Sequence, residues 1–245
     1  MQLSGLAALR RGFGLIRQPG LRRFVLLPLA INVAVLALSL YLLFGWFATW
    51  LDGWLAALPA WLMWLESVFW LVFSLLLLLL VFFGFSLLAN LIAAPFNGLL
   101  AEAVEAQLRG QPAPQSSVQQ LLLELPGVLL DEGRKLGYFA AYALLIWLLS
   151  WIPLLNLLAP FAWFAFAAWI MALQYADYPM GNHQIRFPRQ RRILRRCPAS
   201  SLGFGASTAL VTMIPLLNFL VIPAAVAGAT VLWYEQLEKL AETTP

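Results

Sequence analysis

The sequence predicts an all-α protein that is embedded in a membrane. Apolar residues make up 62% of the 245 positions and charged residues only 11%, whereas about a quarter of the residues in soluble domains are charged. Four stretches contain no Asp, Glu, Lys or Arg: 24–51, 67–101, 136–176 and 197–234. Each exceeds the roughly 18 apolar residues that indicate a membrane helix. We therefore expect a multi-pass integral membrane protein with a single membrane domain over residues 1–245.

The distribution of charge predicts which ends face the cytoplasm. Arginines precede the first stretch at positions 10, 11, 17, 22 and 23, and six more lie between positions 186 and 196. The connection 52–66 carries only Asp52 and Glu66. Because positive charge favours the cytoplasmic side, both termini and the basic loop 177–200 are predicted to be cytoplasmic and residues 52–66 external.

The first two stretches are predicted to be full transmembrane helices within residues 24–101. At about 1.5 Å per residue, their 28 and 35 residues would measure roughly 42 and 52 Å, more than a hydrocarbon core of about 30 Å requires. The second helix is expected to leave the hydrocarbon core near residues 90–98, where Pro95, Asn97 and Gly98 interrupt the apolar run. Residues 102–135 are predicted to form a cytoplasmic helical connector.

The third and fourth stretches share an internal repeat, Ile-Pro-Leu-Leu-Asn, at residues 152–156 and 214–218. Proline suits the start of a helix and disfavours helix before it, and asparagine tolerates a left-handed turn, so each repeat predicts helix, turn, helix. With 198–201 taken as loop, the arms hold 16 and 20 residues in the third stretch and about 12 and 16 in the fourth. A full span needs roughly 20. We predict two re-entrant hairpins, 136–176 and 201–234, with six complete spans as the alternative.

The N-terminal segment 1–23 is predicted to combine an interfacial helix with an anion-binding junction. Leu6, Leu9, Phe13 and Ile16 form an apolar stripe before Gln18. The following Pro19-Gly20-Leu21-Arg22-Arg23 joins a helix start to two guanidinium groups, which suits a tetrahedral oxyanion. Contact of these arginines with lipid phosphate is the alternative. Residues 235–245 are expected to form a C-terminal tail.

Several classes of function are not expected. The uncharged stretches contain no acid, base or histidine, which argues against an enzyme. Cys197 is the only cysteine and has no metal-ligand companions, so neither a metal nor a cofactor is expected. The basic run 186–196 lies where positive loops of membrane proteins occur, so no nucleic-acid partner is expected. The second arms of the hairpins begin near Asn156 and Asn218, which could line an anion path or merely cap a turn.

Four segments of the sequence resemble the CysZ family of bacterial sulfate permeases. They are Gln18-Pro19-Gly20-Leu21-Arg22-Arg23-Phe24, Ala94-Pro95-Phe96-Asn97-Gly98-Leu99-Leu100-Ala101-Glu102, Asp177-Tyr178-Pro179 with Asn182-His183, and Met213-Ile214-Pro215-Leu216-Leu217-Asn218. The resemblance implies an inner-membrane homo-oligomer, a dimer or larger, that brings sulfate into the cytoplasm for cysteine synthesis. It also implies two full-length helices with two partly penetrating hairpins.

The resemblance further implies roles for particular residues. In that family the junction of glycine, hydrophobic residue and arginine binds sulfate, which corresponds here to Gly20, Leu21, Arg22 and Arg23. Asn97 joins Asn156 and Asn218 as a candidate for the ion path. The family is described as proton-dependent, and the candidates for proton handling at the stretch ends are Glu102, Asp177, His183 and Glu235. An uncoupled sulfate channel and a non-transporting membrane scaffold are the alternatives, and sulfate and the lipid bilayer are the expected partners.

Overall fold

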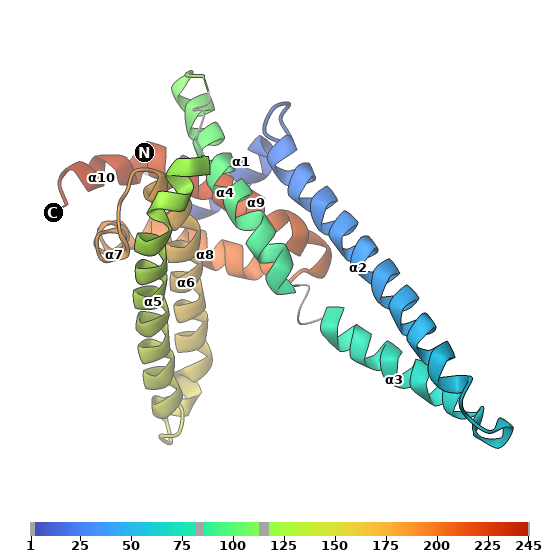
Figure 1. The fold of residues 1–245 in the computed structure, drawn as a ribbon. Helices are drawn as coiled ribbons and strands as arrows, with labels where there is room; N and C mark the ends of the chain where they lie inside the picture. The colour runs from blue at the N-terminus through green and yellow to red at the C-terminus, as the bar shows by residue number, and fades with distance from the viewer. Residues whose placement is uncertain (1–2, 82–85, 113–117, 245) are drawn as a thin grey trace. The chain divides into compact units, whose positions relative to one another are not determined.

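The computed structural model confirms the all-α prediction for the part of the chain that it describes. That part comprises the backbone of residues 3–81, 86–112 and 118–244, with side chains except those of 86–92, 94, 118–130, 215, 216, 218 and 219. It is helical and contains no strand (Figure 1). Four helical segments within it are long and apolar enough to cross a membrane: Arg23–Leu55, Ala60–Leu79, Leu155–Asn182 and Leu220–Glu242. The chain divides into a larger unit, residues 1–25 and 97–245, and a smaller unit, residues 26–96.

The smaller unit consists mainly of apolar helices whose side chains point outward. It contains most of α2 (Arg23–Leu55), the short 3-10 helix η1 (Ala60–Leu62), α3 (Leu65–Leu79) and the start of α4 (Ser86–Arg109). Aromatic rings join α2 to α3, with Phe47 stacked on Phe73 at 3.9 Å between centroids. Only 6% of the apolar window in each of the first two candidate spans is buried. Such surfaces are stable against lipid or another protein, not against water.

The first repeat forms the predicted helix, turn, helix. Helix α5 (Val118–Leu149) and helix α6 (Ala159–Asn182) run side by side, joined by a turn and the 3-10 helix η3 (Leu155–Leu158) (Figure 1). Pro160 lies in the first turn of α6, as its missing amide hydrogen favours. The turn residue with positive φ is Leu154, at 69°, and not Asn156, which lies in η3. The expected left-handed role of this asparagine is therefore wrong.

The second repeat also separates two helices, α8 (Pro198–Thr212) and α9 (Pro215–Leu232). Pro215 lies in the first turn of α9, and Ile214 before it is extended. Residues 198–201, predicted to be loop, instead form the first turn of α8, because Pro198 is accommodated at a helix start. The arms therefore have 15 and 18 residues, longer than predicted.

The two hairpins differ strongly in burial although they share a repeat. Helix α9 forms the centre of the larger unit, with Ala224, Val226 and Val231 fully buried. The tips of both hairpins are exposed, with Leu154 81% and Met213 77% exposed. The difference lies in the second arms, since 72% of the apolar window in Leu220–Glu242 is buried and only 11% of that in Leu155–Asn182. The sequence predicted two equivalent hairpins, whereas the fold makes one of them a core element.

Helix α1 (Gly5–Leu15) packs against α8 and α9 through its smallest residues. A Cβ on Gly12 would lie 2.0 Å from the Ala224 carbonyl oxygen, and one on Gly5 would lie 1.9 Å from the Phe204 amide nitrogen. The buried face contains Gly5, Ala8, Leu9, Gly12 and Leu15. Leu6, a member of the predicted apolar stripe, is 62% exposed. The stripe prediction was wrong at Leu6 because small residues, which permit close backbone approach, define the contact face.

The remaining elements of the larger unit complete its polar side. Helix α4 continues through Pro95 to Arg109, and α7 (Phe187–Arg195) follows the first hairpin. The chain ends with a π-helical turn, η4 (Trp233–Leu237), and α10 (Glu238–Glu242). Arg189 donates from Nε to the Thr244 carbonyl oxygen and from Nη2 to the Ala241 carbonyl oxygen, at 3.0 and 2.9 Å. These bonds satisfy carbonyl groups that a helix end leaves without partners.

Candidate functional site

The junction between α1 and α2 contains a glycine in a left-handed backbone conformation. Gly20 has a φ of 93°, and a Cβ there would meet no atom within 4 Å. The glycine therefore serves a backbone conformation that other residues rarely adopt, and not a tight contact. Leu21 is buried in the core of the larger unit, whereas Arg22 and Arg23 are exposed. Leu21 thus anchors the junction while the two following guanidinium groups face outward.

No carboxylate pairs with Arg22 or Arg23 among the described residues. By contrast, Arg11, Arg109, Arg134 and Arg186 each form an ion pair with an aspartate or glutamate. The guanidinium carbon of Arg23 lies 4.9 Å from the centre of the Phe24 ring, a cation–π contact that leaves its N–H donors unoccupied. The junction therefore presents positive charge that is available to an anion.

The backbone amides at the junction are less available than a free helix start suggests. Those of Leu21 and Arg22 both donate to the Gln18 carbonyl oxygen at 3.2 Å. The amides of Phe24 and Val25 donate to the two carbonyls three residues earlier. An anion at this junction would consequently be held mainly by the guanidinium groups.

A second polar cluster joins α4 to the end of α6. The Asn97 side-chain amide donates to the Tyr178 hydroxyl at 3.3 Å, and that of Asn182 donates to the Gly98 carbonyl oxygen at 3.2 Å. His183 Nε2 lies 2.9 Å from both carboxylate oxygens of Glu105. Two of the segments singled out in the sequence, 94–102 and 177–183, are thus structural partners.

Glu105 is a functional candidate that the sequence interpretation missed. It is buried and accepts hydrogen bonds from Arg109 Nε and Nη2 at 2.9 and 2.7 Å. Arg109 also pairs with Glu238 and lies over the Tyr234 ring at 5.3 Å. The spacing of Glu105 and Arg109 by four residues indicates a helical ion pair. Only the fold reveals the partner His183, 78 residues away.

Glu102, Glu105, Arg109 and His183 line one pocket of about 340 Å³. Its other lining residues are Ala106, Gln111, Pro112 and Asn182. Two of the proton-handling candidates, Glu102 and His183, are therefore brought to the same cavity. This arrangement places carboxylates, an imidazole and a guanidinium group where water can reach them.

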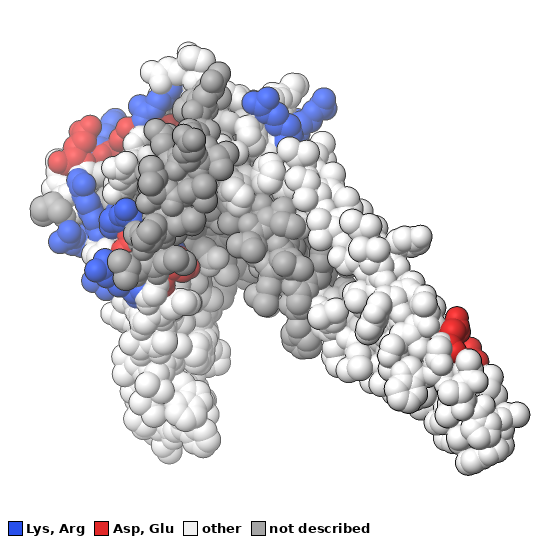
Figure 2. Space-filling view, viewed as in Figure 1, with Lys and Arg blue, Asp and Glu red and all other residues white. Residues whose placement is uncertain are grey.

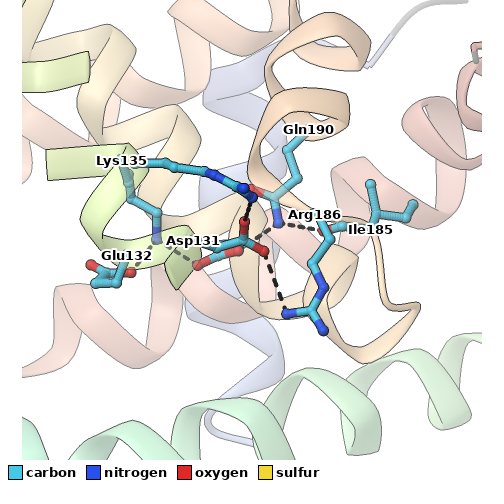
Figure 3. A network of polar contacts seen from close by, with 8 residues as sticks. Asp131, Glu132, Lys135, Ile185, Arg186 and Gln190 are labelled. Carbon is cyan, nitrogen blue, oxygen red and sulfur yellow. Dashed lines mark hydrogen bonds and ion pairs between the residues drawn. The ribbon is translucent and has the colours of Figure 1, made fainter. Parts of the chain in front are cut away.

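Asp177 belongs to a separate network around the buried Lys135 (Figure 3). The Lys135 ammonium donates to Asp177 at 2.6 Å and to Glu132 at 2.8 Å. Gln190 donates to the other Asp177 oxygen and, at 2.8 Å, to the Ile185 carbonyl oxygen. Asp177 thus neutralises a buried cation, which is a structural task that sequence analysis did not reveal.

The remaining candidates lie outside the pocket lining. Glu235 pairs with Arg11 of α1. Asn156 lies at the tip of the first hairpin, beyond the 24 residues of α6, which measure roughly 36 Å. Asn218 is in the helical backbone of α9, but its side chain is outside the described set. Asn156 and Asn97 therefore lie near opposite ends of α6.

The pair of Glu105 and His183 titrates away from ordinary values. Burial raises the pKa of Glu105, but hydrogen bonds from His183 and Arg109 outweigh it, so this pKa lies below its usual range. The hydrogen bond to Glu105 raises the pKa of His183 against the opposing effect of burial. The contribution of charged His183 to folding stability is complete at pH values below 6.5, the ordinary pKa of histidine. It is lost as the pH rises through the raised pKa of His183. The contribution of charged Glu105 to folding stability is lost as the pH falls through its lowered pKa. Both members of the ion pair are therefore charged at pH values between the pKa of Glu105 and that of His183.

Replacing Glu105 with glutamine is expected to lower the titration midpoint of His183. The chain contains one histidine, so its imidazole signals in an NMR titration need no assignment by mutagenesis. In the wild type the midpoint should lie above 6.5, and in Glu105→Gln it should move down because the charged acceptor is lost. Glu66→Gln, in the smaller unit, is the matched control. An unchanged midpoint in Glu105→Gln would contradict the pairing.

Together these features define an α-helical membrane protein with four helical segments long and apolar enough to cross a membrane and with two exposed arginines where α1 meets α2. No group of three or more His, Cys, Asp or Glu side chains suited to a metal ion occurs among the described residues. The chain belongs to the family described as Sulfate transporter CysZ/Etoposide-induced protein 2.4, which matches residues 8–223.

Curated relatives match nearly the whole chain. A protein named Sulfate transporter CysZ from Pseudomonas fluorescens (strain Pf0-1) is 45% identical over 235 residues, which cover 96% of this chain and 94% of the relative. One of the same name from Pectobacterium atrosepticum is 40% identical over 243 residues, covering 99% and 88%. A third, from Vibrio cholerae serotype O1, is 43% identical over 231 residues, covering 94% and 92%.

Proposed function

We propose that this protein carries sulfate across the bacterial inner membrane into the cytoplasm, where it supplies sulfur for cysteine biosynthesis. Membership of the family and the names of the relatives support the substrate. The structural observation that supports sulfate binding is that Arg22 and Arg23 are exposed and have no carboxylate partner among the described residues. Two guanidinium forks can together donate several charge-assisted hydrogen bonds to a divalent oxyanion.

We further propose a multi-pass arrangement with both termini in the cytoplasm and a homo-oligomeric assembly. The arginine-rich segments support this orientation. The outward apolar surfaces of α2 and α3 support contact with lipid or with another copy of the chain. The protein is proposed to act as a transporter and not as an enzyme.

If transport depends on protons, His183 and Glu102 are the proposed residues, with Glu105 as the partner of the histidine. This choice rests on the shared pocket and on the direct contact between His183 and Glu105. Asp177 and Glu235 are weaker candidates because neither lines this pocket. An uncoupled sulfate conduit is the competing form of the same function.

Liposomes that contain the purified protein are expected to take up labelled sulfate faster than protein-free liposomes. Unlabelled sulfate should compete with the uptake of labelled sulfate. Chloride, added at a concentration that carries the same total negative charge, should compete far less. An inward proton gradient that increases the initial rate would support coupling, and an unchanged rate would favour the uncoupled conduit. Absence of uptake by correctly folded protein would favour the scaffold alternative.

We also propose that the two hairpins are re-entrant from the cytoplasm. Single cysteines at Leu155 and Leu217, which are 40% and 38% exposed, should react weakly with an impermeant maleimide added outside intact cells. The background is Cys197→Ser, which removes the one native thiol. A cysteine at Trp61, in the connection predicted to be external, is the positive control. Strong external labelling at either hairpin would indicate complete spans.

A further inference from the structure

We propose that Arg191 and Arg195 of α7, together with Tyr138 of α5, bind the phosphate of an anionic phospholipid. The proposal concerns a site on the larger unit, separate from the residues given to sulfate. It rests on the contacts of these side chains, on their surplus charge and on the surface beside them.

Arg191, Arg195 and Tyr138 already form a polar cluster in which some hydrogen-bonding groups have partners and others do not. The guanidinium carbon of Arg191 lies 4.9 Å from the centre of the Tyr138 ring, and its buried Nε has no hydrogen-bond partner within the described set. The Tyr138 hydroxyl accepts from Arg195 Nη2 at 3.4 Å and from Trp169 Nε1 at 3.1 Å. With both donors in place, the hydroxyl hydrogen is free to point at an additional acceptor. A phosphate oxygen would satisfy it.

Most of the positive charge around α7 has no carboxylate partner. Arg186 pairs with Asp131, whereas Arg189 and Arg196 donate to carbonyl or hydroxyl oxygens near the end of α10, which are neutral. The nearby carboxylates of Glu132 and Asp177 are paired with Lys135. In the described part of the molecule, five arginines therefore have no carboxylate partner: Arg189, Arg191, Arg192, Arg195 and Arg196. Two of these charges, on Arg191 and Arg195, lie beside Tyr138 and are left for an external anion.

The surroundings favour a lipid over a free anion. On α5, Tyr142 lies one turn from Tyr138 and is 40% exposed, and farther toward the hairpin tip the exposed side chains include Leu144, at 55%, and Leu148, at 52%. Figure 2 shows basic side chains gathered over α7, beside a hairpin of α5 and α6 that shows none toward its tip; residues 136–176 contain no Lys or Arg. Tyrosine and tryptophan favour the headgroup level, and arginines beside them attract anionic headgroups. A phosphate held at Arg191 would place its acyl chains along α5, which a free anion cannot exploit.

Native mass spectrometry of the detergent-purified full chain can test the site with phosphatidylglycerol as the probe. Arg191→Gln/Arg195→Gln should reduce phosphatidylglycerol adducts roughly tenfold. Arg10→Gln/Lys239→Gln removes the same charge from exposed positions elsewhere in the larger unit and should leave the adducts unchanged. Equal losses in both variants would overturn the proposal in favour of diffuse attraction.

Further measurements distinguish between the possible ligands and control for misfolding of the variant. Phosphatidylcholine should give far fewer adducts than phosphatidylglycerol, and equal numbers would overturn the selectivity. Excess inorganic phosphate should not displace the lipid, and displacement would show a site for free anions instead. If the double variant unfolds, Tyr138→Phe, which removes the hydroxyl and its bonds from Trp169 and Arg195, should reduce adducts severalfold while the protein stays folded and monodisperse. Unchanged adducts in that folded variant would overturn the role of Tyr138.

Discussion

Replacing Arg22 and Arg23 together by alanine is expected to reduce the initial rate of sulfate uptake into liposomes roughly tenfold to a hundredfold. Hydrogen bonds to charged groups contribute about 1.5–3 kcal/mol each where they are sheltered from water, and less at exposed groups. The loss of both guanidinium groups should therefore weaken sulfate binding roughly tenfold to a hundredfold. Initial rates at sulfate concentrations well below saturation measure this effect directly.

A matched control distinguishes binding from a general change of charge. Arg10→Ala/Arg17→Ala removes the same charge from α1 and from the turn that follows it, and both side chains are exposed. It should preserve uptake, whereas Arg22→Lys/Arg23→Lys should be intermediate, because lysine keeps the charge but loses the planar fork of donors. If the control loses as much uptake as the alanine variant at the junction, specific binding there is refuted.

Gly12→Ala is expected to prevent stable folding of the larger unit. The added methyl group would lie 2.0 Å from the Ala224 carbonyl oxygen and 2.6 Å from the Gly228 amide nitrogen, and both atoms belong to the backbone of α9. Overpacking a close contact usually costs about 1–3 kcal/mol, and here two helices must move apart. The yield of monodisperse protein in size-exclusion chromatography and the melting temperature should both fall.

Gly14→Ala, two residues further along the same helix, provides the control. A Cβ at Gly14 meets no atom within 4 Å, so the substitution should be neutral or slightly stabilising, since alanine favours helix by about 1 kcal/mol over glycine. Equal melting temperatures for the two variants would show that α1 does not pack on α9 as described.

The sequence predicted those features that depend on residues close together in the chain. Proline after isoleucine at 152–153 and 214–215 indicated two helix breaks, and the structure confirms both. The junction at Gly20 was likewise visible, because a glycine beside arginines is a local pattern. The binding of sulfate by Gly20, Leu21, Arg22 and Arg23 stays a prediction.

Contacts between distant segments could not be predicted in the same way. Glu105 stood among other charged residues of a connector until the fold placed it against His183. Asp177 appeared suited to proton handling, but a buried lysine 42 residues away holds its carboxylate. Such pairs depend on how helices pack, and one sequence does not contain that information.

The sequence by itself determined that this chain is helical, lies in a membrane and folds back at both Ile-Pro-Leu-Leu-Asn repeats. Tertiary structure decided that α9 is buried at the centre of the larger unit, while only 11% of the apolar window in the second arm of the first hairpin is buried. The physical reason is that hydrocarbon and protein interior are equally apolar, so leucine and valine suit both. Small residues mark the difference, because Gly5, Gly12 and Gly228 let backbones approach to distances that no lipid contact requires.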